Sequence, residues 1–247
     1  MNLTNYFQRI YIINLRHRHD RRREMAQELE KIGLSFRSPQ IRLFEAVRPE
    51  VSEGFPSIGA RGAFLSHLGI LREARDQNIE RILIFEDDLS FVSGFTAGME
   101  AAIGELERTD WKFFYGGYVL QAPLQPESDS AVICVEPTLE IQTAHFVGLR
   151  GEAIGEAVDY FEAMLVRTGG DPLGGPMHVD GAYSWFRQAN PQMLTVLAMP
   201  QLGFQRSSRS DIYDLRWFDR VPGVLHVIAG LRQLKNHARE SLGMPQG

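Results

Sequence analysis

An uninterrupted apolar run that ends in three adjacent acids most constrains the fold of this chain. In the stretch RILIFEDDLSF, residues 81–91, four apolar residues are followed directly by Glu86, Asp87 and Asp88. A short run of β-branched and aromatic residues is typical of a strand that is covered on both faces. The pattern therefore predicts a buried strand that brings three carboxylates to one point.

The segments around this strand predict an α/β domain. An apolar run at residues 10–15 precedes helical spacing at 20–31, and a weaker strand pattern covers 41–47. Residues 60–80 repeat apolar side chains at i, i+3 and i+4, as expected of a helix with one buried face. This alternation of strands and helices implies crossover connections, and therefore a mainly parallel central sheet flanked by helices.

Later segments have weaker patterns. A Gly- and Pro-rich loop is expected at residues 169–185, and an amphipathic helix at 224–240. The remaining patterns predict a helix at residues 151–165 and strands at 111–117, 131–136, 143–150 and 193–200.

Composition narrows the class of protein. Of 247 residues, 44% are hydrophobic and 23% are charged, as in an ordinary globular domain. The net charge of −5 argues against a nucleic-acid binder, whose surface would be basic. Cys134 is the single cysteine, so no intrachain disulfide forms, and its apolar neighbours predict a buried, inert thiol. With no signal-peptide pattern and no apolar stretch long enough to span a bilayer, we expect a cytoplasmic protein.

Three carboxylates at one edge of the sheet predict a cation site. Ligands of open parallel sheets bind beyond the carboxyl ends of the strands, where these acids are expected. Neighbouring carboxylates raise one another's pKa unless a cation balances them, and hard oxygen ligands suit Mg²⁺ or Mn²⁺. Because strand side chains alternate, Glu86 and Asp88 should face one side and Asp87 the other. A solvated acidic turn is the alternative interpretation.

Arginines supply complementary charge after the first strand. The segment NLRHRHDRR, residues 14–22, opens the first long helix and contains Arg16, Arg18, Arg21 and Arg22. A helix N-terminus with several arginines is suited to a diphosphate. An exposed basic turn is the alternative, but together with the carboxylates the pattern favours a nucleotide held through a bridging cation.

Two further residues are candidates for chemistry. His67 follows Ser66 on the apolar face of the helix predicted at residues 60–80, where a hydrogen-bonded core histidine is the alternative interpretation. Asp180 lies in the Gly-rich loop, either as a general base or as an ordinary turn residue.

Six motifs occur in the order found in glycosyltransferase family 25, the lipopolysaccharide-type transferases related to the collagen galactosyltransferases. The chain resembles this family over residues 10–212, and the separation of FLSH from LIFEDD is the most specific feature. The motifs are YIINLRHRHDRRREM, GARGAFLSHLGILREA, RILIFEDDLSF, TAHFVGLRGEA, MHVDGAY and PQLGFQRSSRSDI. The resemblance implies a GT-A type fold, and transfer of a hexose, often galactose, from a UDP-sugar to a sugar hydroxyl with inversion.

The resemblance also implies roles for single residues. Asp180 becomes the candidate base on the attacking hydroxyl. A metal shell of Mn²⁺ or Mg²⁺ would contain Glu86, Asp88 and Asp211, with Glu86 also near the ribose. The residues implied to bind the UDP-sugar are Asn14, Arg16, Arg21, Ser66, His67 and Glu86.

The resemblance implies one glycosyltransferase domain over residues 1–216 and a C-terminal helical extension at 217–247. The donor-nucleotide half would cover about 1–118 and the acceptor half about 119–216. The implied acceptor is a glycan or lipid-linked glycan such as lipopolysaccharide. The C-terminal helix would then contact the cytoplasmic face of the inner membrane peripherally, unless it is an ordinary packed surface helix.

Two other functions stay open at this point. A Mg²⁺-dependent nucleotidyltransferase or phosphotransferase could also use acids at a strand end, although it explains neither FLSH nor SDI. A catalytically inactive binding module with a glycosyltransferase-like fold is the second alternative.

Overall fold

The computed structural model describes residues 2–124 and 130–206. The chain divides into two units, residues 1–212 and 213–247. The expected C-terminal helix and Asp211 lie outside the described residues, so the predictions that concern them stay predictions.

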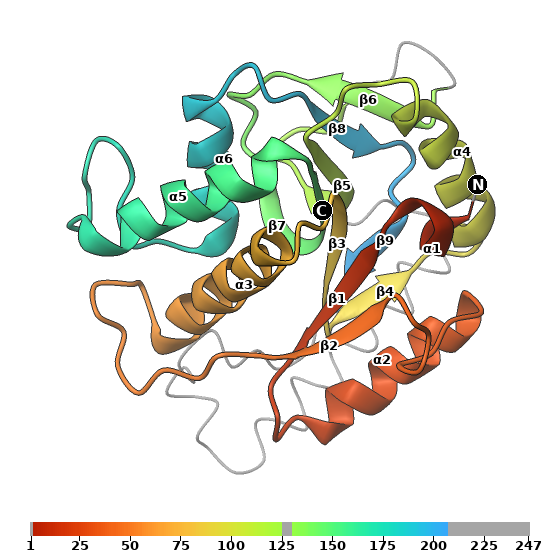
Figure 1. Ribbon diagram of the computed structural model, residues 1–247, viewed down its shortest axis with the longest axis horizontal. Helices are drawn as coiled ribbons and strands as arrows, with labels where there is room; N and C mark the ends of the chain where they lie inside the picture. Colours follow the sequence, from red (N-terminus) through yellow and green to blue (C-terminus); the bar gives the residue numbers. More distant parts are fainter. Residues whose placement is uncertain (1, 125–129, 207–247) are drawn as a thin grey trace. The chain divides into compact units, whose positions relative to one another are not determined.

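Helices and strands alternate along residues 3–86 of the described chain (Figure 1). The helices are α1 (Leu3–Tyr6), α2 (His19–Lys31), α3 (Ile58–Asp76), α4 (Phe95–Leu106), α5 (Glu152–Val166) and α6 (Val179–Ala189). The strands are β1 (Arg9–Asn14), β2 (Ile41–Glu45), β3 (Arg81–Glu86), β4 (Leu89–Phe91), β5 (Phe113–Val119), β6 (Val132–Val135), β7 (Gln142–Arg150), β8 (Thr195–Ala198) and β9 (Gly203–Gln205).

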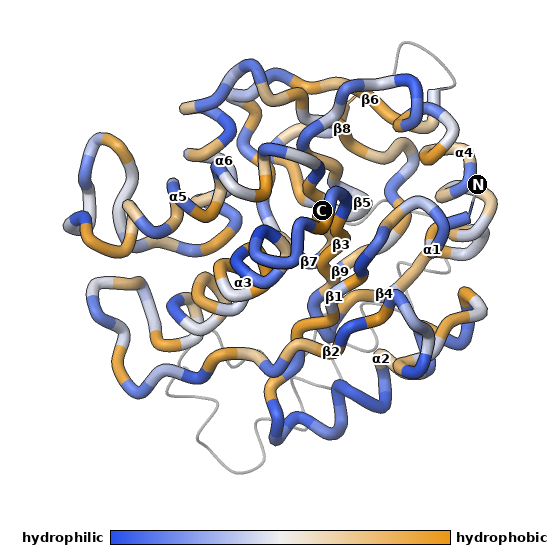
Figure 2. The backbone as a smooth tube through the Cα atoms, viewed as in Figure 1, coloured by the Kyte–Doolittle hydropathy of each residue, from blue (hydrophilic) through white to orange (hydrophobic). Residues whose placement is uncertain are grey.

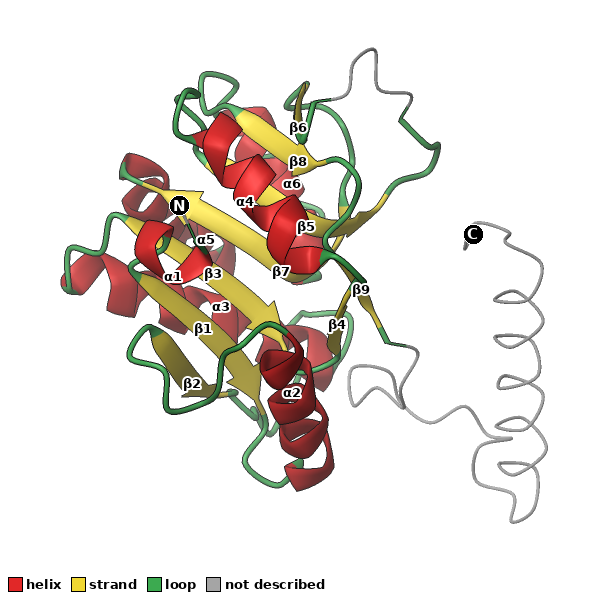
Figure 3. Ribbon diagram, turned by 90° about the vertical axis from the view of Figure 1, so that its right-hand side faces the viewer, coloured by secondary structure: helices red, strands yellow, loops and turns green. Residues whose placement is uncertain are grey.

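Within the described residues the central sheet has seven strands, in the order β2-β1-β3-β7-β5-β8-β6 (Figures 1 and 3). The pairs β2–β1, β1–β3 and β5–β8 are parallel, whereas β7 is antiparallel to both β3 and β5, and β6 is antiparallel to β8. Five strands therefore share one direction, and β7 and β6 run the other way. The predicted mainly parallel sheet is confirmed. Strands β4 and β9 form a separate two-stranded antiparallel ribbon.

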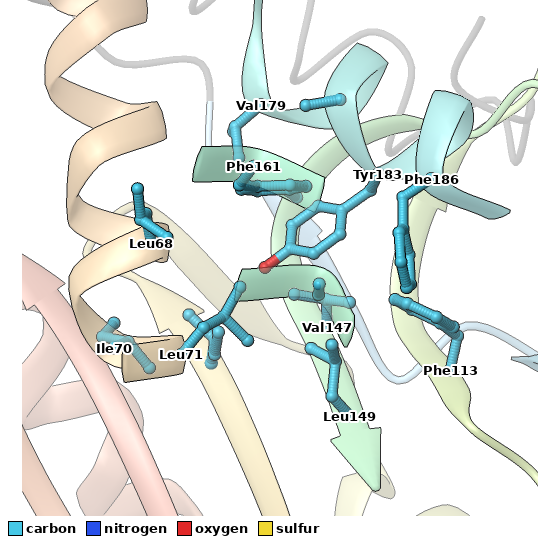
Figure 4. Close-up of a cluster of buried hydrophobic side chains, with 14 of the residues drawn as sticks. Leu68, Ile70, Leu71, Phe113, Val147, Leu149, Phe161, Val179, Tyr183 and Phe186 are labelled. Atoms are coloured by element: carbon cyan, nitrogen blue, oxygen red, sulfur yellow. The ribbon is translucent and has the colours of Figure 1, made fainter. Parts of the chain in front are cut away.

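Helices cover both faces of the central sheet because its strands are apolar on both sides (Figures 1 and 2). In β1, Tyr11 and Ile13 join a core with α3, α5 and α6, whereas Ile10 and Ile12 join a second core with α1, α2 and α4. Successive strand side chains point to opposite faces, so one continuous apolar run fills both cores. Figure 4 shows Tyr183 of α6 among the apolar side chains of the first core.

Two local predictions were wrong. Residues 179–185 are the start of helix α6 rather than part of a loop, because Val179, Ala182 and Phe186 form a buried face at helical spacing. Cys134 is exposed rather than buried, because β6 lies at the edge of the sheet. Neither α4 nor the β4–β9 ribbon was predicted.

No helix in residues 2–124 and 130–206 combines the length and the apolar character needed to cross a bilayer.

The close approach of β5 to β7 depends on Gly117. A Cβ atom at this position would lie 2.5 Å from both His145 Nε2 and the Gly203 carbonyl oxygen. We therefore expect Gly117→Ala to lower the free energy of unfolding by about 1–3 kcal/mol through overpacking. The change is measured by urea denaturation.

Gly155→Ala is the matched control. Gly155 lies inside α5, and among the described residues no heavy atom beyond its own turn of helix is within 4 Å of an added Cβ. Alanine there should raise the free energy of unfolding by about 0.5–1 kcal/mol. If Gly117→Ala and Gly155→Ala changed the free energy of unfolding equally, a side chain at position 117 would fit between β5 and β7, and the prediction would be wrong.

Candidate active site

The three acids form a turn at the carboxyl edge of the sheet, between β3 and β4. Glu86 is the last residue of β3 and pairs with Ile13 of β1, so the acids lie beside the end of β1. We call residues 86–88 the acidic turn. Both Asp87 and Asp88 are buried, with 6% of each residue exposed. The alternative of a solvated acidic turn is therefore wrong.

Arg21 of α2 contacts both aspartates of the acidic turn. Its Nη1 atom lies 2.8 Å from Asp87 Oδ1 and 3.5 Å from Asp88 Oδ2. The expectation that Asp87 points away from the site is wrong, because the strand and its alternation end at Glu86 and the chain turns at Asp87.

Asn14 fixes the side of the turn that faces β1. Its Nδ2 group donates to Asp87 Oδ2 at 2.7 Å and to the Arg18 carbonyl at 3.2 Å. Its Oδ1 atom accepts two hydrogen bonds from Arg22, at 2.9 and 3.0 Å. The buried amide is thus engaged within the protein, and it holds Asp87 and the start of α2 in place.

The negative charge of the acidic turn exceeds the charge that Arg21 supplies. Burial raises the pKa of Asp88 to about 7, and the charges of Glu86 and Asp87 add to this effect while Arg21 opposes it. Burial also raises the pKa of Asp87, although the charge of Arg21 lowers it in part. Asp88 Oδ1 is enclosed and accepts no hydrogen bond from the described residues. An unpaired carboxylate oxygen in such surroundings is suited to a cation.

A complete metal shell is not present in the part of the chain that the structure describes. There, no group of three or more His, Cys, Asp or Glu side chains is placed to hold a metal ion. Mg²⁺-type sites often use one or two carboxylates and complete the shell with water and substrate phosphates. The oxygen donors of the acidic turn therefore fit a cation of this kind that a substrate helps to hold.

Glu86 contacts His67, which in turn contacts Tyr183. His67 Nε2 lies 3.4 Å from Glu86 Oε1, and its Nδ1 atom lies 3.1 Å from the Tyr183 hydroxyl. His67 and Tyr183 are fully buried, whereas the Glu86 side chain is 16% exposed. Burial raises the pKa of Glu86, but His67, followed by His145 and Arg21, outweighs burial and lowers it. Glu86 is therefore kept ionised, and His67 is a hydrogen-bonded core residue behind it.

Ser66 lies inside the fold rather than at the surface of the site. Its hydroxyl donates to the Gly62 carbonyl at 2.7 Å and accepts from the Val47 N–H at 2.8 Å. Ser66 thus ties the segment after β2 to helix α3.

A pocket of about 480 Å³ opens beside the ends of β1 and β2. Arg16, Arg48 and Glu45 give it mixed charge, and Arg16 is exposed. Since Glu45 pairs with Asn14, and β1 lies between β2 and β3, the pocket and the acidic turn share one edge of the sheet. The lining residues are Leu15, Arg16, His17, His19, Glu45, Ala46 and Arg48.

Asp180 lies in the first turn of α6 and anchors the start of β7. Its Oδ2 atom accepts from the Thr143 N–H at 3.0 Å, and its Oδ1 atom accepts from the Gly181 N–H at 2.9 Å. Thr143 has φ +70°, which is strained for a β-branched residue and persists only where contacts enforce it. The Thr143 hydroxyl lies 2.9 Å from His145 Nδ1.

The sequence interpretation missed three residues at the site: His145, Gln205 and Arg206. His145 is buried, and burial lowers its pKa while the charge of Glu86 opposes this change. Gln205 Nε2 donates to Asp88 Oδ2 at 3.2 Å, and Arg206 binds the backbone of the acidic turn. Their signal was present, since all three lie in the motifs TAHFVGLRGEA and PQLGFQRSSRSDI.

The described chain is a three-layer α/β fold with acids and arginines at the carboxyl edge of its sheet, as expected of a GT-A type fold. A solved glycosyltransferase involved in the glycosylation of the major capsid of PBCV-1 has a similar fold. The TM-score is 0.50 at 12% identity, over 82% of this chain and 94% of that one. The predicted GT-A type fold is confirmed.

The model of glycosyltransferase family 25 (LPS biosynthesis protein) matches residues 39–143. Procollagen galactosyltransferase 1-A of Xenopus laevis is 30% identical over 144 residues, which cover 49% of this chain and 23% of that protein. Procollagen galactosyltransferase 2 of Mus musculus is 28% identical over 192 residues, covering 70% and 29%. These matches confirm the resemblance to glycosyltransferase family 25. The chain spans less than a third of the length of these relatives.

We expect Asp88→Asn to stabilise the metal-free protein. The pKa of Asp88 is higher in the folded chain than its unfolded value of about 4, so ionisation destabilises the fold as pH rises from about 4 to about 7. The free energy of unfolding should therefore increase by about 1 kcal/mol or more at pH 8 and by less at pH 5. Urea denaturation at both values measures the difference.

Asp76→Asn is the control, because the Asp76 side chain is 65% exposed and, among the described residues, forms an ion pair only with its neighbour Arg75. It should leave the pH dependence unchanged. If Asp88→Asn destabilises the protein at pH 8, repulsion between the carboxylates of the acidic turn does not lower the stability of the fold.

Proposed function

We propose that this chain is a metal-dependent inverting glycosyltransferase that moves a hexose, galactose in the first instance, from a UDP-sugar to a sugar hydroxyl. The observation that carries the proposal is the buried acidic turn, in a chain that resembles glycosyltransferase family 25. Arg21 lies at Asp88 Oδ2, and Asp88 Oδ1 is unpaired within the described residues. The galactosyltransferase relatives support the hexose.

In this proposal the nucleoside occupies the pocket at the ends of β1 and β2, and the diphosphate extends toward the acidic turn. Arg16, an exposed residue, lines the pocket, and Arg21 lies at the turn. A guanidinium can bind phosphate through two parallel hydrogen bonds. Asn14, Ser66 and His67 contribute by holding these elements in position, since their side chains are buried and engaged within the protein.

Asp88 would hold Mn²⁺ or Mg²⁺, with Asp211 and Glu86 as the other proposed protein ligands. When bound, such an ion neutralises the negative charge that grows on the leaving diphosphate. The buried acids would keep this region electrostatically suited to a cation in the absence of substrate, since Asp88 Oδ1 is enclosed and unpaired within the described residues.

Asp180 is the proposed base. Its carboxylate accepts two backbone hydrogen bonds, which fix its orientation. A carboxylate has about four acceptor positions, so two remain to receive the hydroxyl proton of the acceptor. The proposed acceptor is a bacterial surface glycan such as lipopolysaccharide, reached on the cytoplasmic face of the inner membrane.

A second candidate function is a binding module without transferase activity. It is favoured by one relative, inactive glycosyltransferase 25 family member 3 of Homo sapiens, which is 30% identical over 144 residues covering 51% of this chain and 24% of that protein.

The first experiment tests the donor and the metal together. The chain is incubated with UDP-galactose, UDP-glucose or nucleoside triphosphates, with Mn²⁺ or with chelator, and release of UDP or pyrophosphate is followed. We expect UDP release from one UDP-hexose that chelator abolishes. Pyrophosphate release would favour a nucleotidyltransferase, and Mn²⁺-dependent UDP binding without turnover on any glycan acceptor would favour the binding module.

Asp180→Asn tests the base. Loss of the base should lower kcat by about 10²–10⁴-fold, because the acceptor hydroxyl is no longer deprotonated during attack. The Kd of the donor, measured by calorimetry, should change by less than about threefold. Asp171→Asn is the matched control in the neighbouring loop, where Asp171 accepts a hydrogen bond from the Leu173 N–H. Unchanged kcat in Asp180→Asn would place the base elsewhere.

A further inference from the structure

The backbone of the acidic turn is bound by a single arginine at the end of β9. Arg206 Nη2 donates to the Asp87 carbonyl at 2.7 Å, and Nη1 donates to the Leu89 carbonyl and to Ser90 Oγ. The Arg206 main-chain N–H donates to the Asp88 carbonyl at 2.7 Å. Arg206 therefore satisfies three consecutive carbonyl groups, those of residues 87–89.

The turn needs such support because β4, the strand that follows it, is short. Each strand of the β4–β9 ribbon has three residues, with Leu89 opposite Gln205. Two-stranded ribbons are marginally stable in water even when they are longer. Adjacent carboxylates in addition repel one another and favour opening of the turn. A cation on the carbonyl side opposes both effects.

Arg206 is itself held by helix α2. Glu24 Oε2 lies 3.3 Å from Arg206 Nη2, and Glu28 Oε1 lies 3.9 Å from Nη1. Glu28 also accepts a hydrogen bond from the Phe91 N–H at 3.0 Å. Since Arg21, Glu24 and Glu28 recur at i, i+3 and i+7, one face of α2 presents a cation to the carboxylates and two anions to Arg206.

Gln205 contacts the side chain of Asp88, whereas Arg206 contacts the backbone of the turn. Its amide donates to Asp88 Oδ2 and leaves Oδ1 of the same carboxylate without a hydrogen bond from the described residues. Gln205, which is 117 positions away in the sequence, therefore acts with Arg21 to orient the Asp88 carboxylate.

We propose that Arg206, assisted by Gln205, is a positioning residue that fixes the acidic turn so that Asp88 presents one free oxygen to the cation and its diphosphate. The proposal rests on the proposed function of the same site. Arg206 does not touch the reacting atoms in this role; it acts through the backbone of residues 87–89.

The experiment measures UDP binding by calorimetry at saturating Mn²⁺, together with Mn²⁺ binding followed by electron paramagnetic resonance. We expect Arg206→Gln to weaken Mn²⁺-dependent UDP binding at least tenfold. Arg206→Lys, which keeps the charge but not the fork of donors, should fall between Arg206→Gln and the unsubstituted chain. Millimolar guanidinium should partly restore binding to Arg206→Ala.

Two further variants separate positioning from general stability. Gln205→Leu changes an exposed side chain and should weaken Mn²⁺ binding several-fold without lowering Tm. Arg72→Gln removes a surface arginine that pairs with Glu162, and it should leave binding unchanged. These variants keep the test decisive if Arg206→Gln does not fold.

The outcomes are distinguishable. If the unsubstituted chain binds no UDP in the presence of Mn²⁺, the proposed function is wrong, and the role of Arg206 falls with it. If the unsubstituted chain binds, but folded Arg206→Gln and Gln205→Leu bind equally well, the proposed function stands and the positioning role is overturned. A lower Tm with unchanged affinity would likewise reduce Arg206 to a stabilising residue.

Discussion

The repulsion between neighbouring carboxylates at the end of β3 is the constraint on which the rest of the site depends. Two arginines oppose this repulsion. Arg21 contacts the carboxylates of Asp87 and Asp88, whereas Arg206 donates hydrogen bonds to the backbone carbonyls of the same two residues. Both arginines are in turn tied to helix α2. The helix, the turn and β9 are therefore fixed relative to one another by alternating charge as well as by apolar packing.

Much of this fold could be predicted because buried positions are apolar and recur with the period of a strand or a helix. Strands β1 and β3 are apolar on both faces, so their runs identify a covered sheet, and α3 shows one apolar stripe. The location of the acids at the sheet edge followed from the same pattern. Their directions did not, since the alternation of side chains holds only to Glu86, where the strand ends.

Other features depend on contacts that no local pattern records. Helix α6 begins within a Gly- and Pro-rich segment, and only the packing of Val179 and Ala182 shows that this segment is helical. The exposure of Cys134 follows from the place of β6 in the strand order, which its apolar sequence does not reveal. Arg206 and Asp87 are 119 positions apart, so their pairing required the tertiary structure.

The antiparallel direction of β7 explains how Asp180 of α6 is connected to the acidic turn. Because β7 runs antiparallel between β3 and β5, its first residues lie at the edge where the parallel strands end. Thr143 there binds Asp180, and His145 lies near enough to Glu86 for their charges to interact. A parallel strand would instead bring its last residues to this edge. The strained Thr143 thus lies where β7 joins Asp180 of α6 to the His145 side of the acidic turn. Gly117 of β5 leaves the space that His145 needs.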